Sequence, residues 1–261
     1  MQGYFDALAG EYDTSFTQSA IGKAQRDRVW NYLELHLLKN RNQRILEVNG
    51  GTGADAAWFW EKGNQVCFSD ASPAMVEVAR QNLSGTDVRV LQADFQEIFL
   101  QTGDAVFDLI FSNFGGLNCI SPEELRVFLT KANLALKPGG DFVAVVMPRF
   151  CVWESLYFLL KEPSKTFRRW SGKAEARMPE ITIPVYYFSP FEFAEMAPSN
   201  WKVQGLVPVG FFIPPSNFSR FMEGKPGLMK SLSFLEKQLS NHSPLAGLSD
   251  HYLIHFKKTR S

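Results

Sequence analysis

The segment from Arg44 to Gly53, with the sequence RILEVNGGTG, carries the clearest chemical signal in the chain. An apolar run that contains an acid, Glu47, is followed by a turn with three glycines and by the alanine-rich residues 54–61. A strand that breaks into a glycine turn and then a helix brings bare backbone close to a ligand at the carboxyl edge of a sheet. The pattern therefore predicts a binding site for a nucleotide-type cofactor.

Two more acids follow the next apolar runs of the chain. Asp70 ends the second run, 23 positions after Glu47, and Asp94 follows the third. In a parallel sheet the carboxyl ends of neighbouring strands meet at one edge, where an acid at the end of the second strand accepts hydrogen bonds from ribose hydroxyls. Each acid also has a local explanation, since Asp70 can begin a turn and Asp94 can cap the helix after it.

Apolar runs alternate with helical periodicity over about a hundred residues of the first half. Ser72 and Ser121 each precede a proline, which is the pattern of an N-cap followed by proline at the first helical position. The alternation predicts a parallel sheet with helices on both faces. We expect strands over residues 44–49, 65–70, 88–93, 107–112 and 141–147, and helices over 54–62, 73–83, 95–101 and 122–136.

The pattern changes after Met147. If the last two strand candidates, 201–213 and 251–257, join the same sheet, residues 149–189 and 214–249 are insertions at its carboxyl edge, where open α/β sheets bind ligands. We expect a single domain over 1–261 with an N-terminal helical cover over 1–40. Within the second half we also expect a helix over 150–161, a basic loop over 165–177, an extended run over 181–188, a short helix over 190–196 and an interrupted helix over 217–239.

Composition narrows the function classes. Lys plus Arg equal Asp plus Glu at 27 each, so no global field draws the chain to nucleic acid or anionic lipid. The three cysteines lie far apart, which indicates neither a disulfide framework nor a zinc site. The N-terminus is not that of a signal peptide, and every apolar run is too short to cross a bilayer. We therefore expect a cytoplasmic protein, a monomer or a homodimer, without nucleic acid or membrane partners.

Five motifs, in order and spacing, resemble those of the class I S-adenosylmethionine-dependent methyltransferases, and the N-terminus resembles their small-molecule branch. The motifs are Glu47 to Gly53, Asp70, Ala93-Asp94-Phe95, Phe107 to Ile110, and Leu136 to Gly140, with Tyr4-Phe5-Asp6 and Glu11-Tyr12-Asp13 at the N-terminus. The resemblance covers residues 1–148. It implies a Rossmann-like, seven-stranded, mostly parallel sheet with an antiparallel last strand, S-adenosyl-L-methionine as cofactor, and methyl transfer to a small, apolar or aromatic acceptor.

The resemblance also implies roles for single residues. Gly51 and Gly53 let the main chain pass against the methionine part and the ribose of the cofactor. Glu47 lies near the ammonium group, and Asp70 accepts from the ribose hydroxyls. Further expected contacts are Asp94 with the adenine amino group, Phe95 through its amide, Ala71 and Met75 as walls of the adenine slot, and Ser112 near the activated methyl group.

Two positions of the cofactor site have a second interpretation. Tyr12 belongs to the segment that folds over the cofactor in similar enzymes, or it packs its ring on the sheet. Asn49 stands where the family usually has its first glycine, and asparagine tolerates left-handed backbone better than other residues with side chains. We expect the turn to keep its shape with Asn49 in place.

The acceptor side is less defined. A general base is needed only if the acceptor is protonated at neutral pH. We consider Asn113, His242 and His251 as the groups that face the acceptor, although Asn113 can also cap a turn and an exposed histidine is the commoner outcome. We expect His36 and His255 to be structural. Arg26 could pair with the cofactor carboxylate, but it has no fixed motif spacing, and we expect it to be an exposed charge on a helix.

The insertions are rich in aromatic residues, which can line an apolar substrate cavity, attach the cover to the domain, or form a dimer surface. Two other functions fit parts of the sequence. Lys161, Lys165, Arg168, Arg169, Lys173 and Arg177, with Phe167 and Trp170, could bind RNA, but acids dilute this cluster and a solvated loop is the simpler interpretation. The spacing of Asn49, Gly51 and Ala54 approximates the fingerprint of an NAD-dependent oxidoreductase, but no proton-relay pair accompanies it.

Overall fold

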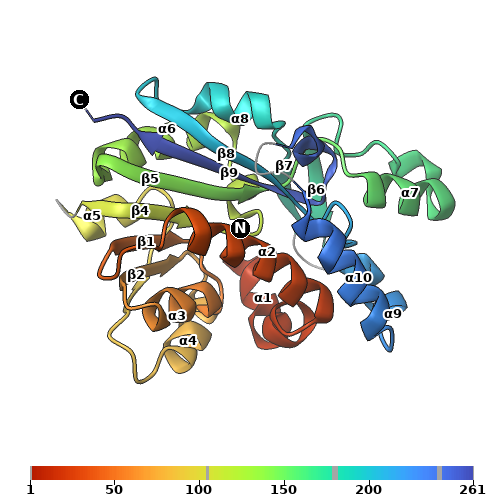
Figure 1. Ribbon diagram of the computed structural model, residues 1–261, viewed down its shortest axis with the longest axis horizontal. Helices are drawn as coiled ribbons and strands as arrows, with labels where there is room; N and C mark the ends of the chain where they lie inside the picture. Colours follow the sequence, from red (N-terminus) through yellow and green to blue (C-terminus); the bar gives the residue numbers. More distant parts are fainter. Residues whose placement is uncertain (1, 104–105, 178–181, 240–242, 261) are drawn as a thin grey trace.

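A computed structural model describes residues 2–103, 106–177, 182–239 and 243–260 (Figure 1). Seven strands form one sheet in the order β3-β2-β1-β4-β5-β9-β8. The strands are β1 Arg44–Val48, β2 Gln65–Asp70, β3 Arg89–Gln92, β4 Phe107–Ser112, β5 Leu136–Val146, β8 Trp201–Val209 and β9 His251–Lys258. In the described part of the chain, no helix has the length and apolar character that a membrane span requires.

Only β9 runs against its two neighbours, β5 and β8, while the first five strands pair in parallel. This arrangement confirms the expected Rossmann-like sheet with an antiparallel last strand. From β1 the chain moves outward to β2 and β3 and then returns to β4 on the other side of β1. The strand order therefore reverses between β1 and β4, which is the place where such sheets bind ligands.

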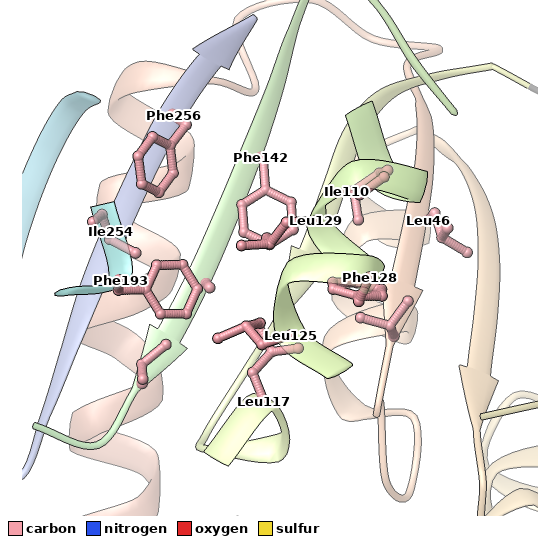
Figure 2. Close-up of a cluster of buried hydrophobic side chains, with 14 of the residues drawn as sticks. Leu46, Ile110, Leu117, Leu125, Phe128, Leu129, Phe142, Phe193, Ile254 and Phe256 are labelled. Carbon is pink, nitrogen blue, oxygen red and sulfur yellow. The ribbon is translucent and has the colours of Figure 1, made fainter. Parts of the chain in front are cut away.

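Helices cover both faces of the sheet, as expected. On one face, Leu33 of α2, Phe59 of α3 and Val76 of α4 pack against the strands. On the other, Phe128 of α6 and Phe193 of α8 join Phe142, Phe256 and their neighbours (Figure 2). The helices are α1 Gln2–Tyr12, α2 Ala20–His36, α3 Ala54–Glu61, α4 Pro73–Asn82, α5 Ile98–Thr102, α6 Pro122–Ala135 and α8 Pro190–Met196.

The expected helix starts have the expected caps. The Ser72 hydroxyl accepts a hydrogen bond from the Met75 amide, 3.1 Å away, at the start of α4. Ser121 and Glu124 form a reciprocal capping box at the start of α6. These caps satisfy amides that a helix leaves unpaired at its first turn. Helix α5 starts later than expected, at Ile98, and Asp94 caps the turn before it, where its carboxylate accepts from the amides of Gln96 and Glu97.

The second half follows the expected order with two differences. The expected basic loop over 165–177 is partly wrong, because Lys173–Arg177 forms strand β6 and pairs antiparallel with β7, Thr182–Tyr186. The small alanines that alternate with charges in β6 gave little apolar signal. The strand expected over 201–213 ends at Val209, since Gly210 turns the chain with a φ of +78°.

The two expected insertions leave the carboxyl edge, one after β5 and one after β8. The first holds α7, Val152–Lys161, the short helix η3, Pro163–Lys165, and the β6–β7 hairpin. The second holds η4, Ser216–Phe218, α9, Ser219–Met222, α10, Pro226–Lys237, and η5, Pro244–Leu248. Figure 1 shows α7, α9 and α10 at the same end of the molecule.

Candidate functional site

A pocket lies at the carboxyl edge of the sheet, where β1, β2, β3 and β4 end. Nine residues expected in the site line it: Tyr12, Asn49, Gly51, Asp70, Ala71, Met75, Asp94, Phe95 and Asn113. Three others expected there, Glu47, Gly53 and Ser112, are not among the described residues that line it. The sequence motifs therefore converge on one cavity, although they come from segments far apart in the chain.

The glycine turn after β1 adopts left-handed backbone at three positions. The φ angles are +50° at Asn49, +58° at Gly51 and +85° at Gly53. Asn49 thus takes the conformation that was expected of it. A Cβ atom at Gly53 would lie 3.0 Å from Leu83 of the α4 end, so this glycine permits close packing of α4. Gly51 faces the ring of Tyr12 instead.

Asn49 joins the ends of β1 and β4. Its Nδ2 donates to the Asn113 carbonyl at 3.0 Å, and its Oδ1 accepts from the Ser112 hydroxyl at 2.6 Å. The side chain fills the space beside Gly116, where a Cβ atom would overlap the Asn49 amide carbon. Gly116 therefore accommodates the asparagine that replaces the usual first glycine of the turn.

Asp70 and Asp94 are held by backbone amides at the pocket wall. The two oxygens of Asp70 accept from the amides of Gly51 and Ser72, each at 2.9 Å. Burial raises the pKa of Asp70 despite these bonds. One oxygen of Asp94 accepts from the amides of Gln96 and Glu97 at 2.8 and 2.9 Å, so the expected capping role is present. Both carboxylates keep lone pairs for a ligand.

Glu47 lies beneath the glycine turn and is fully buried. Neither of its carboxyl oxygens has a hydrogen-bond partner among the described residues. Burial raises its pKa well above the usual range, and the neighbouring Asp55 carboxylate adds to the effect. Buried polar atoms without partners are rare and often mark functional sites. The unpaired carboxyl oxygens of Glu47 could therefore accept a hydrogen bond from a cofactor bound at the turn.

Arg26 is buried at the same edge, so the expectation of an exposed helix charge is wrong. Its Nε lies 3.3 Å from Oδ1 of Asp55. The other Asp55 oxygen accepts from Asn113 Nδ2 at 2.8 Å. Helix α2 buries this face against the strand ends, which its sequence alone did not indicate. Arg26 and Asp55 thereby hold the Asn113 amide in place.

Phe114 forms an aromatic part of the pocket wall. Its φ of +45° is unusual for a residue with a bulky side chain, and such strained backbone clusters at functional sites. Its ring contacts Phe16, with centroids 5.0 Å apart, and lies 5.3 Å from the Arg26 guanidinium carbon. The sequence placed Phe114 at the end of the fourth strand, near the expected methyl group, but Gly115 and Gly116 were missed, although a glycine pair just after a strand was a usable signal.

The histidines named in the sequence analysis differ in their distance from the pocket. His251 is buried; its Nδ1 lies 3.2 Å from Asp250, and its ring packs edge-on against Phe114 at 5.7 Å. It reaches the pocket through Phe114, since it is not among the described lining residues. His255 is buried between Tyr32 and Asp141, as expected of a structural residue. His242 lies outside the described residues.

Helix α1 lies against the pocket. Phe5 and Tyr12 line it, and burial raises the pKa of Tyr12 to about 12. Two aspartates fasten this N-terminal segment: Asp6 accepts from the Ser72 hydroxyl and the Ala74 amide, and Asp13 accepts from Thr52 and Asn82. These four donors belong to the glycine turn and α4, so the segment is attached to the elements that form the pocket.

The insertions pack against one another and against the domain. Trp153 and Tyr157 of α7 contact Phe218 of the second insertion, and Trp153 donates to the Phe211 carbonyl at 2.9 Å. These rings attach the cover, which was one of the expected roles. Arg169 is also buried, in ion pairs with Glu154 and Asp250, and so is not free to contact phosphates.

Comparisons with known proteins identify the class of fold. The family model described as "Methyltransferase domain" matches residues 45–140. The solved structure of DhpI in complex with SAH superposes with a TM-score of 0.63 at 16% identity, covering 100% of this chain and 96% of that one. An S-adenosylmethionine-dependent methyltransferase from Mesorhizobium loti gives 0.57 at 15% identity, covering 88% and 98%. These structures share the fold described above.

Relatives of known function agree with that class. A demethylmenaquinone methyltransferase from Clavibacter sepedonicus is 32% identical over 141 residues, which is 53% of this chain. The match spans only about half of that relative, 54% of its length. The ubiquinone/menaquinone biosynthesis C-methyltransferase UbiE of Serratia proteamaculans is 27% identical over 78% of each chain. Residues 45–140 are therefore similar to a methyltransferase domain, and the chain has the fold of the solved S-adenosylmethionine-dependent methyltransferases. Neither the RNA-modifying nor the NAD-dependent alternative is supported by these similarities.

Proposed function

We propose that the protein transfers the methyl group of S-adenosyl-L-methionine to a small apolar acceptor at the Phe114 end of the pocket. The observation that supports this most directly is the composition of the pocket wall. The carboxylates of Asp70, at the end of β2, and Asp94, after β3, line it, and the ring of Phe114 lines it after β4. The cofactor supplies a methyl group on a sulfonium, ready for in-line displacement.

The residues that would hold the cofactor fit its polar groups. Each Asp70 oxygen already accepts one backbone amide and has a further lone pair for a ribose hydroxyl. Asp94 is placed by two amide bonds and would accept from the adenine amino group. Ala71, Met75 and Phe95 would form the apolar walls around the base. Glu47 would accept, directly or through water, from the ammonium group.

The acceptor is proposed to be the reduced, electron-rich form of a quinone-like ring, or a similar apolar molecule with a nucleophilic atom, because a sulfonium transfers its methyl group as an electrophile. Both relatives described above are named for quinone methylation, and the pocket wall beyond the carboxylates is aromatic. Asn113 would orient the acceptor, because Asp55 fixes its amide. His251 would accept a proton, if the acceptor must lose one, through Nε2, since Asp250 faces its other ring nitrogen. His242 stays a prediction.

Titration calorimetry with S-adenosylhomocysteine and with NAD tests the cofactor. We expect binding of the first only, weakened about tenfold or more in Asp70→Ala because two ribose hydrogen bonds are lost. Glu77→Ala is the matched control, since Glu77 is exposed on α4. Equal binding of NAD, or unchanged affinity in Asp70→Ala, would refute the assignment. Incubation with labelled S-adenosylmethionine and a quinone-containing lipid extract, followed by mass spectrometry, then identifies the acceptor.

A further inference from the structure

The insertions present an unusual amount of apolar surface. Half of the large apolar side chains that are exposed among the described residues, nine of eighteen, lie within residues 156–170 and 221–235. On α7, Leu156, Leu159 and Leu160 are 51%, 55% and 84% exposed. Phe167 and Trp170, in the turn after α7, are 57% and 59% exposed, and their rings contact each other. We call these five side chains the docking face. Single exposed apolar residues need no explanation, but clusters mark interaction surfaces.

Helix α7 is fixed by its inner side and directs the leucines outward. Trp153 and Tyr157 pack against Phe218, and Glu154 is buried in ion pairs with Arg168 and Arg169. The three leucines follow the i, i+3, i+4 spacing of one helix stripe. Helix α7 therefore has one side that packs on the protein and a second, apolar side that the described part of the chain leaves in solvent.

Positive charge surrounds the docking face. Residues 152–173 contain five basic and two acidic residues, a net charge of +3. Lys161 is exposed, and the Lys165 side chain is 51% exposed although it pairs with Glu162. Arg169, which is also in this count, is buried and pairs with Asp250, outside the segment. Residues 216–237 of the second insertion contain four basic and two acidic residues, a net charge of +2. Since the whole chain is neutral, the remainder carries −5. The expectation of no lipid contact rested on the neutral net charge of the whole chain. That net charge does not reveal that positive charge is concentrated in the insertions.

We propose that the docking face binds an anionic lipid surface. Exposed leucines, an aromatic pair with tryptophan, and lysines beside them form the pattern of helices that lie in the membrane interface. A second copy of the chain is a poorer occupant, because a two-fold interface places the same patch against itself and brings +3 against +3. An anionic lipid surface complements that charge instead.

Docking would bring the pocket edge of the sheet toward the lipid. Helix α7 follows β5 at the carboxyl edge, the edge at which the pocket lies. An apolar acceptor dissolved in the bilayer would then reach the enzyme without crossing water. This consequence rests on the proposed function, whereas the docking itself does not.

Co-sedimentation of the full chain with vesicles tests the proposal. The probes are vesicles of phosphatidylcholine alone and vesicles that also contain phosphatidylglycerol, without cofactor or acceptor. We expect sedimentation with the anionic vesicles, reduced by salt. Leu159→Ser with Leu160→Ser should lower the partition coefficient about tenfold or more, and Lys161→Glu with Lys165→Glu about tenfold. The matched control is Leu134→Ser, a substitution of a leucine that is 77% exposed on α6, a helix that lies at the other end of the molecule from α7 (Figure 1).

Brominated lipid gives a second measurement that does not depend on variants that weaken binding. It should quench tryptophan fluorescence, and Trp170→Phe should remove part of that quenching. Absence of sedimentation with both vesicle types, or equal loss in Leu134→Ser, would overturn the proposal. So would a concentration-dependent dimer that Leu159→Ser and Leu160→Ser convert to monomer without any lipid binding, since the docking face would then cover a second copy. Because no methyl transfer is measured, these outcomes are independent of the proposed acceptor.

Discussion

The side chain of Asn49 occupies the space that the missing side chain of Gly116 leaves. Asn49 links the ends of β1 and β4 through the Ser112 hydroxyl and the Asn113 carbonyl, and a Cβ atom at Gly116 would overlap it. The departure from the usual glycine at position 49 is thus matched by a glycine at a distant position. The two residues together shape the wall between the turn and Phe114.

This pairing predicts a compensating double variant. Gly116→Ala should destabilise the protein by about 1–3 kcal/mol, because the added methyl group forces Asn49 aside. Asn49→Gly should cost about 1–2 kcal/mol through the loss of its hydrogen bonds. The double variant should cost less than the sum, since Asn49→Gly removes the atoms that the new methyl group meets. Denaturant unfolding of the four proteins measures the coupling.

Gly227→Ala serves as the control for this cycle. Gly227 lies in α10, and a Cβ atom there would meet nothing within 4 Å. Alanine is favoured in helices, so this variant should be neutral or slightly stabilising. Strict additivity of Asn49→Gly and Gly116→Ala would show that the two positions are independent.

The contrast between Asp70 and Gly116 shows what the sequence could reveal. Asp70, Asp94 and Gly51 follow directly on apolar runs, so local pattern placed them at the carboxyl edge, and the parallel sheet followed from the strand–helix alternation. Gly116 depends on which strand lies beside β1. Likewise the burial of Arg26 depends on the path of α2 across the strand ends. Such relationships arise from tertiary packing and have no local signature.

Glu47 provides a stability prediction whose sign follows from its environment. Burial holds its folded-state pKa well above 4.5, the ordinary value. The contribution of such a carboxyl group to the free energy of unfolding is fully present below its unfolded-state pKa. It is lost as the pH rises, because ionising the buried group costs free energy in the folded state. Glu47→Gln should therefore raise the melting temperature at pH 7, with a gain that shrinks as the pH falls toward 4.5. Thermal unfolding across this range measures it.

The same variant should weaken cofactor binding, because a neutral amide is a poorer partner for the ammonium group than a carboxyl group that can ionise. A rise in stability together with a loss of S-adenosylhomocysteine affinity is expected of a group kept for function. Glu97→Gln, a change at an exposed position before α5, should alter neither property. A Glu47→Gln protein that melts lower at pH 7 would contradict the assigned burial cost.

The aspartates of the N-terminal cover predict a kinetic effect. Asp6→Ala removes an acceptor shared by the Ser72 hydroxyl and the Ala74 amide, and Asp13→Ala removes the bonds to Thr52 and Asn82. Each change should loosen α1 by about 1–2 kcal/mol and raise the dissociation rate of S-adenosylhomocysteine about tenfold. Stopped-flow fluorescence measures this rate. Glu11→Ala, an exposed position on α1, should leave it unchanged.

Arg169 predicts how strongly the first insertion is attached to the domain. It donates to Glu154 at 2.6 Å and to Asp250 at 3.1 Å. Burial acts to raise the pKa of both carboxyl groups, but Arg168 and Arg169 hold the pKa of Glu154 below its usual value, and His251 and Arg169 hold that of Asp250 below its usual value. Arg169→Met would leave two buried carboxylates without this partner and should cost about 3–5 kcal/mol. Because Asp250 also faces His251, the variant should release the insertion and displace the proposed proton acceptor together. Limited proteolysis within residues 149–177 and the pH dependence of methyl transfer report these two effects.

Arg168→Met is the matched control for this prediction. Arg168 also pairs with Glu154, but its side chain is 34% exposed, so its loss should cost much less stability. If both variants behaved alike, the buried ion pairs of Arg169 would not be what attaches the insertion to β9.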